Sequence, residues 1–167
     1  MAKSTRDPKL QPASSEAAGM RFAIVAARFN WHITEPLLKG AQAAFKKAGV
    51  TTAIPVIQVP GAFEIPLVAK RLVETKLYDA VLTLGAVIRG DTPHFDYVAG
   101  ECARGVMQVG LVTGVPVLFG VLTTDNEAQA VARAGGPKGE TLVDNKGADC
   151  ALSAIETVLA LRLAAKK

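Results

Sequence analysis

Short apolar runs alternate along the chain with longer stretches in which apolar residues recur every three or four positions. The runs predict strands, and we expect them at residues 21–27, 54–59, 80–88 and 116–122. The periodic stretches predict helices, which cover residues 37–48, 65–73, 98–109, 126–134 and 148–159. Four strands alternating with helices indicate an α/β protein, a three-layer α/β/α sandwich around a four-stranded parallel sheet.

The predicted strands also differ in their expected places in the sheet. The run at 80–88 is a nearly continuous apolar segment, as expected for a central strand that helices cover on both faces. The last strand begins with Pro116, which lacks a backbone N–H and is tolerated best at a sheet edge. Ligands of parallel sheets bind beyond the carboxyl ends of the strands. In this chain those ends are residues 27–30, 59–64, 87–92 and 119–124.

The composition narrows the class of protein. A chain of 167 residues fits one domain, which we place at residues 21–167, after a flexible polar arm at residues 1–20. The arm has no apolar core of a signal peptide, and we expect a soluble cytoplasmic protein. Half of the residues are hydrophobic, a high share that suggests burial between subunits as well as within one. The net charge of +4 comes without a basic run, which argues against a nucleic-acid partner.

Metal ligands are scarce in the sequence. The only cysteines, Cys102 and Cys150, lie far apart and form no C-x-x-C pair, and the chain has two histidines. A structural zinc site needs more ligands at closer spacing, so we expect no metal site. The two cysteines fit small core residues on helices.

The segment from Gly90 to His94 is the strongest candidate for binding chemistry. Thr92 followed by Pro93 is typical of a helix N-cap and first helical residue. The N–H groups of such a helix end attract an anion such as phosphate. His94 would lie in the first turn, where it could move protons near neutral pH. The alternative, a histidine that only caps or packs, remains equally open from this pattern.

Other residues near the predicted strand ends have two interpretations each. Phe29 and Phe63 could stack on a flat ring from opposite sides. Glu64 could bind hydroxyl groups of a ligand or simply stabilise the first turn of a helix, and Arg133 could bind an anion or simply favour a helix end. The phosphate-binding G-x-x-x-x-G-K-[ST] and G-x-G-x-x-G motifs do not occur in the sequence, which disfavours nucleoside triphosphates and dinucleotides.

Six segments in order resemble one family. They are Arg28-Phe29-Asn30, PGAFEIP at 60–66, GAVIRGDTPHFDYV at 85–98, FGVLTTDN at 119–126, RAG at 133–135 and NKGA at 145–148. Together they strongly resemble lumazine synthase, the penultimate enzyme of riboflavin biosynthesis, from about residue 20 onward. The resemblance implies a catalytic domain, for which we expect a flavodoxin-like architecture.

The resemblance also implies roles for individual residues. His94 would donate and accept protons, Arg133 would bind phosphate with help from Lys146, and Phe119 would come from the adjacent subunit. The remaining implied substrate-binding residues are Phe29 and Asn30 at the pyrimidine ring, Ala62, Phe63 and Glu64 at the ribityl chain, Ala86, Val87 and Ile88 with backbone contacts to the pyrimidine, and Asp91 and Thr92 at the phosphate turn. Many relatives carry a small residue where Asp91 stands, and an acid there should weaken anion binding unless its side chain turns away.

The implied reaction joins 5-amino-6-ribitylaminouracil to 3,4-dihydroxy-2-butanone 4-phosphate and needs no cofactor and no metal. Rival interpretations are a protein that binds lumazine or flavin without catalysis, and a purely structural shell subunit. A general FMN-binding protein of flavodoxin type is a weaker rival, because Arg28-Phe29-Asn30 stands where a Ser/Thr/Gly-rich phosphate loop is expected. The first rival would lack His94 or Arg133, and the second would need no polar cleft.

For assembly, the resemblance implies a homopentamer with active sites at subunit interfaces. In the family, a longer link between the last two helices hinders the packing of pentamers into a hollow shell. Here Arg133 and Lys146 are 13 positions apart, with Gly135 to Glu140 between them. We therefore expect a free pentamer.

Overall fold

The computed structural model of the protein describes residues 14–136, 142 and 144–165. Its strands are β1 (Phe22–Ala27), β2 (Val56–Val59), β3 (Ala80–Ile88) and β4 (Val117–Thr124). Its helices are α1 (Ser14–Ala17), α2 (Trp31–Lys47), the 3-10 turn η2 (Ala62–Glu64), α3 (Ile65–Glu74), α4 (His94–Thr113), α5 (Glu127–Arg133) and α6 (Lys146–Ala164). The strands form one parallel sheet in the order β2-β1-β3-β4.

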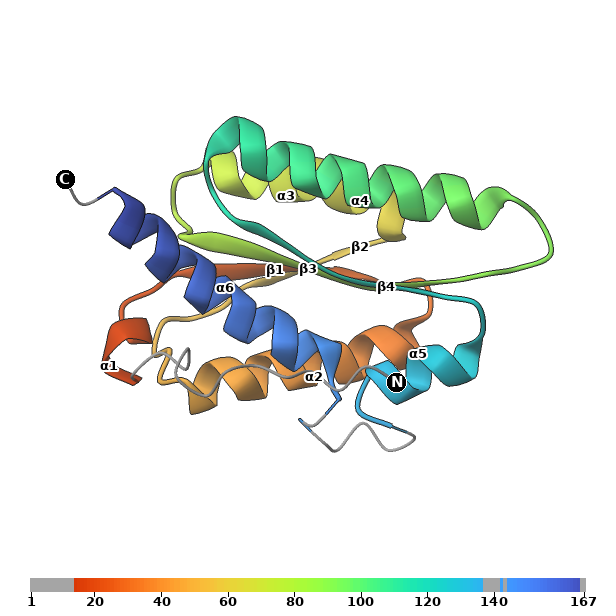
Figure 1. The fold of residues 1–167 in the computed structure, drawn as a ribbon, viewed down its shortest axis with the longest axis horizontal. Coiled ribbons are helices and arrows are strands. Elements are labelled where there is room, and N and C mark those ends of the chain that lie inside the picture. Colours follow the sequence, from red (N-terminus) through yellow and green to blue (C-terminus); the bar gives the residue numbers. More distant parts are fainter. Residues whose placement is uncertain (1–13, 137–141, 143, 166–167) are drawn as a thin grey trace.

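Helices cover both faces of this sheet in three layers. Helices α3 and α4 lie on one face, and α2, α5 and α6 lie on the other (Figure 1). The alternation of side chains along β1 serves both layers. Phe22 and Ile24 pack in the cluster with α2 and α6, whereas Ala23 and Val25 pack in the cluster with α3 and α4. The predicted flavodoxin-like α/β/α sandwich is therefore confirmed.

Strand β3 is central and β4 is an edge strand, as the sequence predicts. The predicted start of β2 and the predicted end of β4 need correction. Strand β2 begins at Val56, two residues later than expected, because the pairing with β1 begins there. Strand β4 continues to Thr124, because it stays paired with β3 as far as Ile88.

The ordered core begins earlier in the chain than residue 21, where we placed the start of the domain. Residues near the end of the predicted polar arm form helix α1, and both Ala17 and Met20 are fully buried in the core. Thr51 and Thr52 hold this segment by donating hydrogen bonds from their hydroxyl groups to Ala18 and Met20 carbonyl oxygens, at 2.7 and 2.6 Å. Residues 1–13 of the predicted arm lie outside the described residues.

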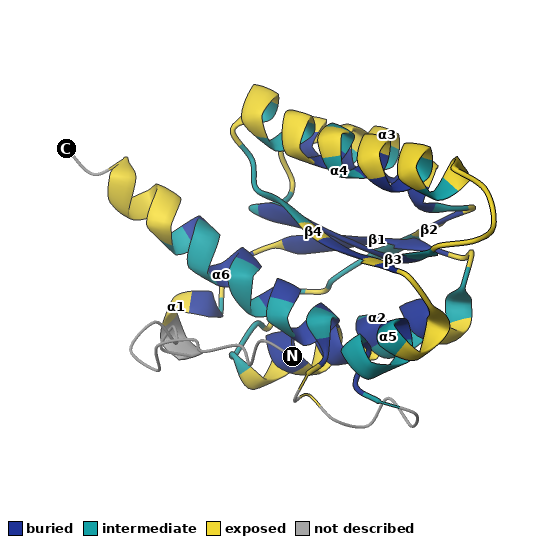
Figure 2. Ribbon diagram, turned by 45° about the vertical axis from the view of Figure 1, so that its right-hand side comes forward, coloured by how far each residue is buried: buried dark blue, intermediate teal, exposed yellow. Residues whose placement is uncertain are grey.

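The C-terminal part of α6 contrasts with this packed segment. The last turns of α6 are exposed and extend beyond the sheet (Figure 2). The free-pentamer prediction depends on the link between α5 and α6, and half of that link, residues 137–141 and 143, lies outside the described residues. Within the described ranges, no helix has both the length and the apolar character to cross a membrane.

Candidate active site at the carboxyl ends of the strands

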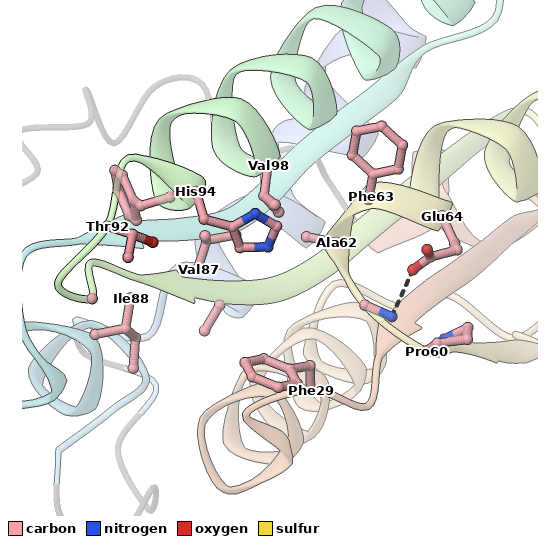
Figure 3. A pocket seen from close by; sticks show the side chains of 14 residues that line it. Phe29, Pro60, Ala62, Phe63, Glu64, Val87, Ile88, Thr92, His94 and Val98 are labelled. Atoms are coloured by element: carbon pink, nitrogen blue, oxygen red, sulfur yellow. Dashed lines mark hydrogen bonds between the residues drawn. The ribbon is translucent and has the colours of Figure 1, made fainter.

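A cleft of about 480 Å³ opens where the chain leaves β1, β2 and β3. This is the switch point of the sheet, because β2 and β3 lie on opposite sides of β1. Nine residues predicted from the sequence line it: Phe29, Ala62, Phe63, Glu64, Ala86, Val87, Ile88, Thr92 and His94. Figure 3 shows side chains from four separate segments turned toward this common space.

Two phenylalanine side chains border the cleft with little cover from the rest of the chain. Phe29 is 72% exposed and Phe63 is 59% exposed. The backbone holds Phe29 in place, because Arg28 and Phe29 donate their N–H groups to the carbonyl oxygens of Val59 and Pro60 at 2.8 and 3.0 Å. Exposed aromatic rings on a fixed backbone can stack on a flat ligand at low entropic cost.

Asn30 does not line the cleft but fixes its floor. It has a left-handed backbone, with φ of 58°, and precedes α2. Its Nδ2 atom donates to the carbonyl oxygen of Ala86 at 3.0 Å. Asparagine tolerates this backbone conformation better than most residues do. The side chain thus joins the start of α2 to the end of β3 and keeps Phe29 beside that strand.

The end of β3 provides backbone groups toward the cleft. Pairing with β1 stops at Leu84, whereas pairing with β4 continues to Ile88. Strand alternation directs the backbone N–H and C=O of Ile88 to the same edge as those of Ala86, on the side where β1 has ended. A flat heterocycle with donors and acceptors on its edge could pair with such an overhang, as a further strand would.

The turn after β2 is shaped by Glu64. Its Oε2 atom accepts a hydrogen bond from the Gly61 N–H at 2.9 Å, which closes η2 (Figure 3). Within this turn Ala62 is buried and Phe63 is exposed. Glu64 therefore does stabilise a first turn, as the simpler interpretation holds. Its carboxylate is exposed at the cleft, with lone pairs left to accept bonds from a polyhydroxylated ligand.

Helix α4 begins at the opposite wall of the cleft. His94 is its first residue, and the side chain is exposed toward the cleft (Figure 3). The expected capping pattern is wrong by one position: Pro93 is the N-cap, and no side chain caps the helix. The reason is that the Pro93 carbonyl oxygen accepts the N–H of Asp96 at 3.0 Å and so closes the first turn. The first N–H groups of the helix still lack intrahelical acceptors and can bind an anion.

The loop between β3 and α4 is held by Arg89, which sequence reasoning missed. Its guanidinium donates to both carboxylate oxygens of Asp96 at 3.1 and 3.3 Å and to Asp125 at 3.2 Å. It also lies over the ring of Phe95, 4.2 Å from the centroid. The hydrogen bonds that Arg89 donates to Asp96, and then to Asp125, raise the pKa of its guanidinium above the ordinary value. The clamp is exposed, so we ascribe to it orientation of the loop and little stability.

Five lining residues were given no individual role from the sequence: Pro60, Gly61, Gly90, Phe95 and Val98. A signal for Val98 was present, because it lies four residues after His94 and so on the same face of the helix. Asp91 is exposed and does not belong to the lining residues.

Three predicted site residues lie away from this cleft. Phe119 and Lys146 line a smaller hollow of about 240 Å³ between β4 and α6. Arg133 ends α5 and lines neither space, and its Nη1 atom donates to the Gln129 carbonyl oxygen at 3.0 Å. Phe119 is 41% exposed on an edge strand. One chain therefore does not bring these three residues to His94.

The main cleft and the smaller hollow between β4 and α6 also differ in their charged side chains. Among the described residues that line the main cleft, Glu64 and His94 are the ionisable ones, and the rest are uncharged. Lys146 borders the smaller hollow and is paired with Asp149 at 2.8 Å. The cleft that could orient a heterocycle thus has no lysine or arginine among its described lining residues.

The two cysteines are small buried residues on helices α4 and α6, as predicted. Burial raises the pKa of Cys102 from its ordinary 9.0 to about 11, which makes the thiol unreactive near neutral pH.

These features define an α/β sandwich protein with a cleft at the switch point of a parallel sheet, bordered by two exposed aromatic rings, Glu64 and His94. The model of the 6,7-dimethyl-8-ribityllumazine synthase family matches residues 19–162. The chain belongs to this family, whose members are transferases of riboflavin biosynthesis.

Proposed function

We propose that the protein condenses 5-amino-6-ribitylaminouracil with 3,4-dihydroxy-2-butanone 4-phosphate. The products are 6,7-dimethyl-8-ribityllumazine, phosphate and two waters. The observation that carries the proposal is the meeting of Phe29, Glu64 and His94 around one cleft in a chain of this family.

The pyrimidine substrate has a natural place in the proposal. Its ring stacks on Phe29, beside Asn30, and its edge pairs with the overhanging backbone of residues 86–88. The ribityl chain runs along Ala62 and Phe63, where Glu64 accepts hydrogen bonds from its hydroxyl groups. The support is the exposure of the two aromatic rings and the free capacity of the Glu64 carboxylate.

The butanone phosphate takes the other side of the cleft. Its phosphate binds at the turn of Asp91 and Thr92, against the first N–H groups of α4. His94 in that turn gives and takes protons at the reacting carbons. The carbonyl and the amine form a C=N bond and release water, phosphate is eliminated, and ring closure releases the second water. Holding both substrates in one cleft supplies much of the rate.

Cationic side chains strengthen the binding of a phosphorylated substrate, and the described lining residues of the main cleft include no lysine or arginine. We propose that Arg133 and Lys146 come from the adjacent subunit, together with Phe119. The cleft and the β4–α6 hollow lie in different parts of one chain, so contact between them in two copies is head-to-tail, and such contacts can close a ring. The proposed ring is a homopentamer.

Apolar side chains on the α3–α4 layer are consistent with subunit contacts. They are 64–77% exposed: Leu67, Tyr97, Met107, Leu111 and Val112. Monomeric soluble proteins rarely expose large contiguous apolar patches, so apolar residues that gather on one layer are typical of a surface that binds another subunit.

The test is to incubate the purified protein with both substrates and to follow the absorbance of the lumazine product, with light scattering on the same sample. We expect product and a particle of five 17.4 kDa chains. Tight binding of a pyrimidine analogue without product would indicate the non-catalytic alternative. A megadalton particle would contradict the free pentamer, and an active monomer would contradict the shared site.

A further inference from the structure

Asn145 is a fully buried polar residue at the start of α6. Its Oδ1 atom accepts the N–H groups of Gly147 and Ala148 at 2.9 and 3.1 Å. Its Nδ2 atom donates to the carbonyl oxygens of Pro36 and Ala134 at 3.0 and 2.9 Å. A side-chain amide has two donors and two acceptor sites, so all four are used.

These bonds join three helices at one point. Pro36 lies inside α2 and is 109 positions from Asn145, Ala134 directly follows α5, and Gly147 belongs to α6. The space around the amide is closed. A Cβ atom on Gly40 would overlap the Asn145 amide, and one on Gly147 would overlap the Leu37 carbonyl. The side chain therefore has one position and one orientation.

The position of Asn145 has a consequence for two cations. Ala134 and Asn145 form an antiparallel bridge, and Arg133 and Lys146 are the residues next to them. In antiparallel pairing the residue before one partner lies opposite the residue after the other. The bridge thus brings Arg133 and Lys146 to the same end, although 12 residues separate them in the sequence.

We infer that Asn145 is a positioning residue that holds Arg133 and Lys146 together as one anion-binding pair. It touches neither substrate. The Nδ2 atom fixes the residue after Arg133, and the Oδ1 atom fixes the helix end that begins with Lys146. The inference rests on the proposed function only for the identity of the anion as the phosphate of the butanone substrate.

The substitution Asn145→Asp tests the role of the amide, because it replaces only the side-chain NH2 group by an oxygen. Asn145→Asp keeps an acceptor for the α6 N–H groups, because aspartate is an equally good N-cap. It loses both donors, and an oxygen then faces the carbonyl oxygens of Pro36 and Ala134. We expect the KM for the butanone phosphate to rise about 10-fold or more, since small misplacements of binding groups cost this much. The KM for the pyrimidine should stay within about twofold.

A matched control uses the same substitution on the neighbouring helix. Asn126 is the N-cap of α5 at an exposed site, and its side-chain Oδ1 atom accepts the Gln129 N–H at 2.9 Å. Asn126→Asp keeps that acceptor and should change neither KM. A double-mutant cycle adds a readout that a merely structural role would not move: Arg133→Ala should weaken phosphate binding much less in the Asn145→Asp background than in the wild type.

The first measurement is titration calorimetry with inorganic phosphate, followed by steady-state kinetics. If the wild type makes no lumazine, the proposed function fails, while phosphate binding still tests Asn145. Equal changes in both KM values, no change in either, or full additivity with Arg133→Ala would overturn the inference. If Asn145→Asp does not fold, Asn145→Ser, which keeps one donor and one acceptor, should show a smaller effect in the same direction, and its absence would also overturn the inference.

Discussion

The cleft at the carboxyl ends and the β4–α6 edge make different contributions to the proposed site. The cleft has aromatic rings, an overhanging backbone edge and His94, but its described lining residues include no lysine or arginine. The edge has Phe119, Arg133 and Lys146 near a hollow of half the volume. Within one chain the stacking rings and the cationic side chains are therefore in separate places, which is why we propose a site shared by two copies.

Loss of the proton-transfer group should give the largest effect. We expect His94→Ala to lower kcat by ~10²–10⁴-fold, toward the low end because positioning of the substrates carries part of the rate. Binding of a ribitylaminopyrimidine analogue, measured by fluorescence titration, should stay within a few-fold. An unchanged kcat, or loss of analogue binding by a folded variant, would remove His94 from this role.

The next prediction separates the two halves by substrate. Arg133→Ala should raise the KM for the butanone phosphate far more than that for the pyrimidine, because a charge-assisted hydrogen bond contributes ~1.5–3 kcal/mol. Phe29→Ala should do the reverse, since covering an aromatic ring contributes about 1.5–3 kcal/mol. Steady-state kinetics with each substrate varied in turn gives all four values. Equal changes in KM for both substrates in both variants would contradict the assignment of the two substrates to separate parts of the site.

The free energy of unfolding should also depend on alkaline pH through a cysteine on α4, the helix that borders the cleft. Cys102 lies fully buried on α4, and its pKa is raised to about 11. Below pH 9 the thiol is protonated in both folded and unfolded chains and has no effect. Between pH 9 and 11 the unfolded chain loses the proton first, so the free energy of unfolding should fall by about 1.4 kcal/mol per unit.

Denaturant unfolding at pH 8 and pH 10.5 measures this effect. Compared with the wild type, Cys102→Ala should lose less stability between the two pH values, whatever offset the smaller side chain causes at pH 8. A parallel loss in both proteins would mean that the thiol is not responsible.

Mixing subunits should give the smallest but most direct signal. In random pentamers of equal amounts of His94→Ala and Arg133→Ala chains, about a quarter of the interfaces join an intact cleft to an intact edge. We therefore expect activity near a quarter of the wild-type value, assayed with butanone phosphate below its KM after co-refolding. Activity no higher than the average of the two separate variants would place the site in one chain.

The sequence predicted local features of the cleft well because they are periodic or lie at strand ends. The apolar run at 80–88 correctly indicated a central strand, and Pro116 correctly indicated an edge. The N-cap of α4 was predicted one residue early, because the sequence Thr92-Pro93 is compatible with a helix that begins at Pro93 and with one that begins at His94. Only the bond between Asp96 and the Pro93 carbonyl decides between them.

The edge half was harder to predict because its contacts are distant in sequence. Nothing in NKGA indicates that Asn145 reaches Pro36, 109 positions away. Likewise, Arg89 binds Asp125 across 36 positions, and neither residue belongs to a periodic pattern. Such contacts follow from the packing of complete elements, which local patterns do not contain.

The unequal lengths of β1 and β3 have a consequence for the size of the ligand. Four residues of β3, from Gly85 to Ile88, extend past the last residue paired with β1. At roughly 3.3 Å per residue they span about 13 Å. Lengthening β1 by two residues would cover half of this overhang, so the proposed pairing of the pyrimidine with the β3 backbone would have a shorter edge available. Variation at the end of one strand could thus change substrate size while the fold stays the same.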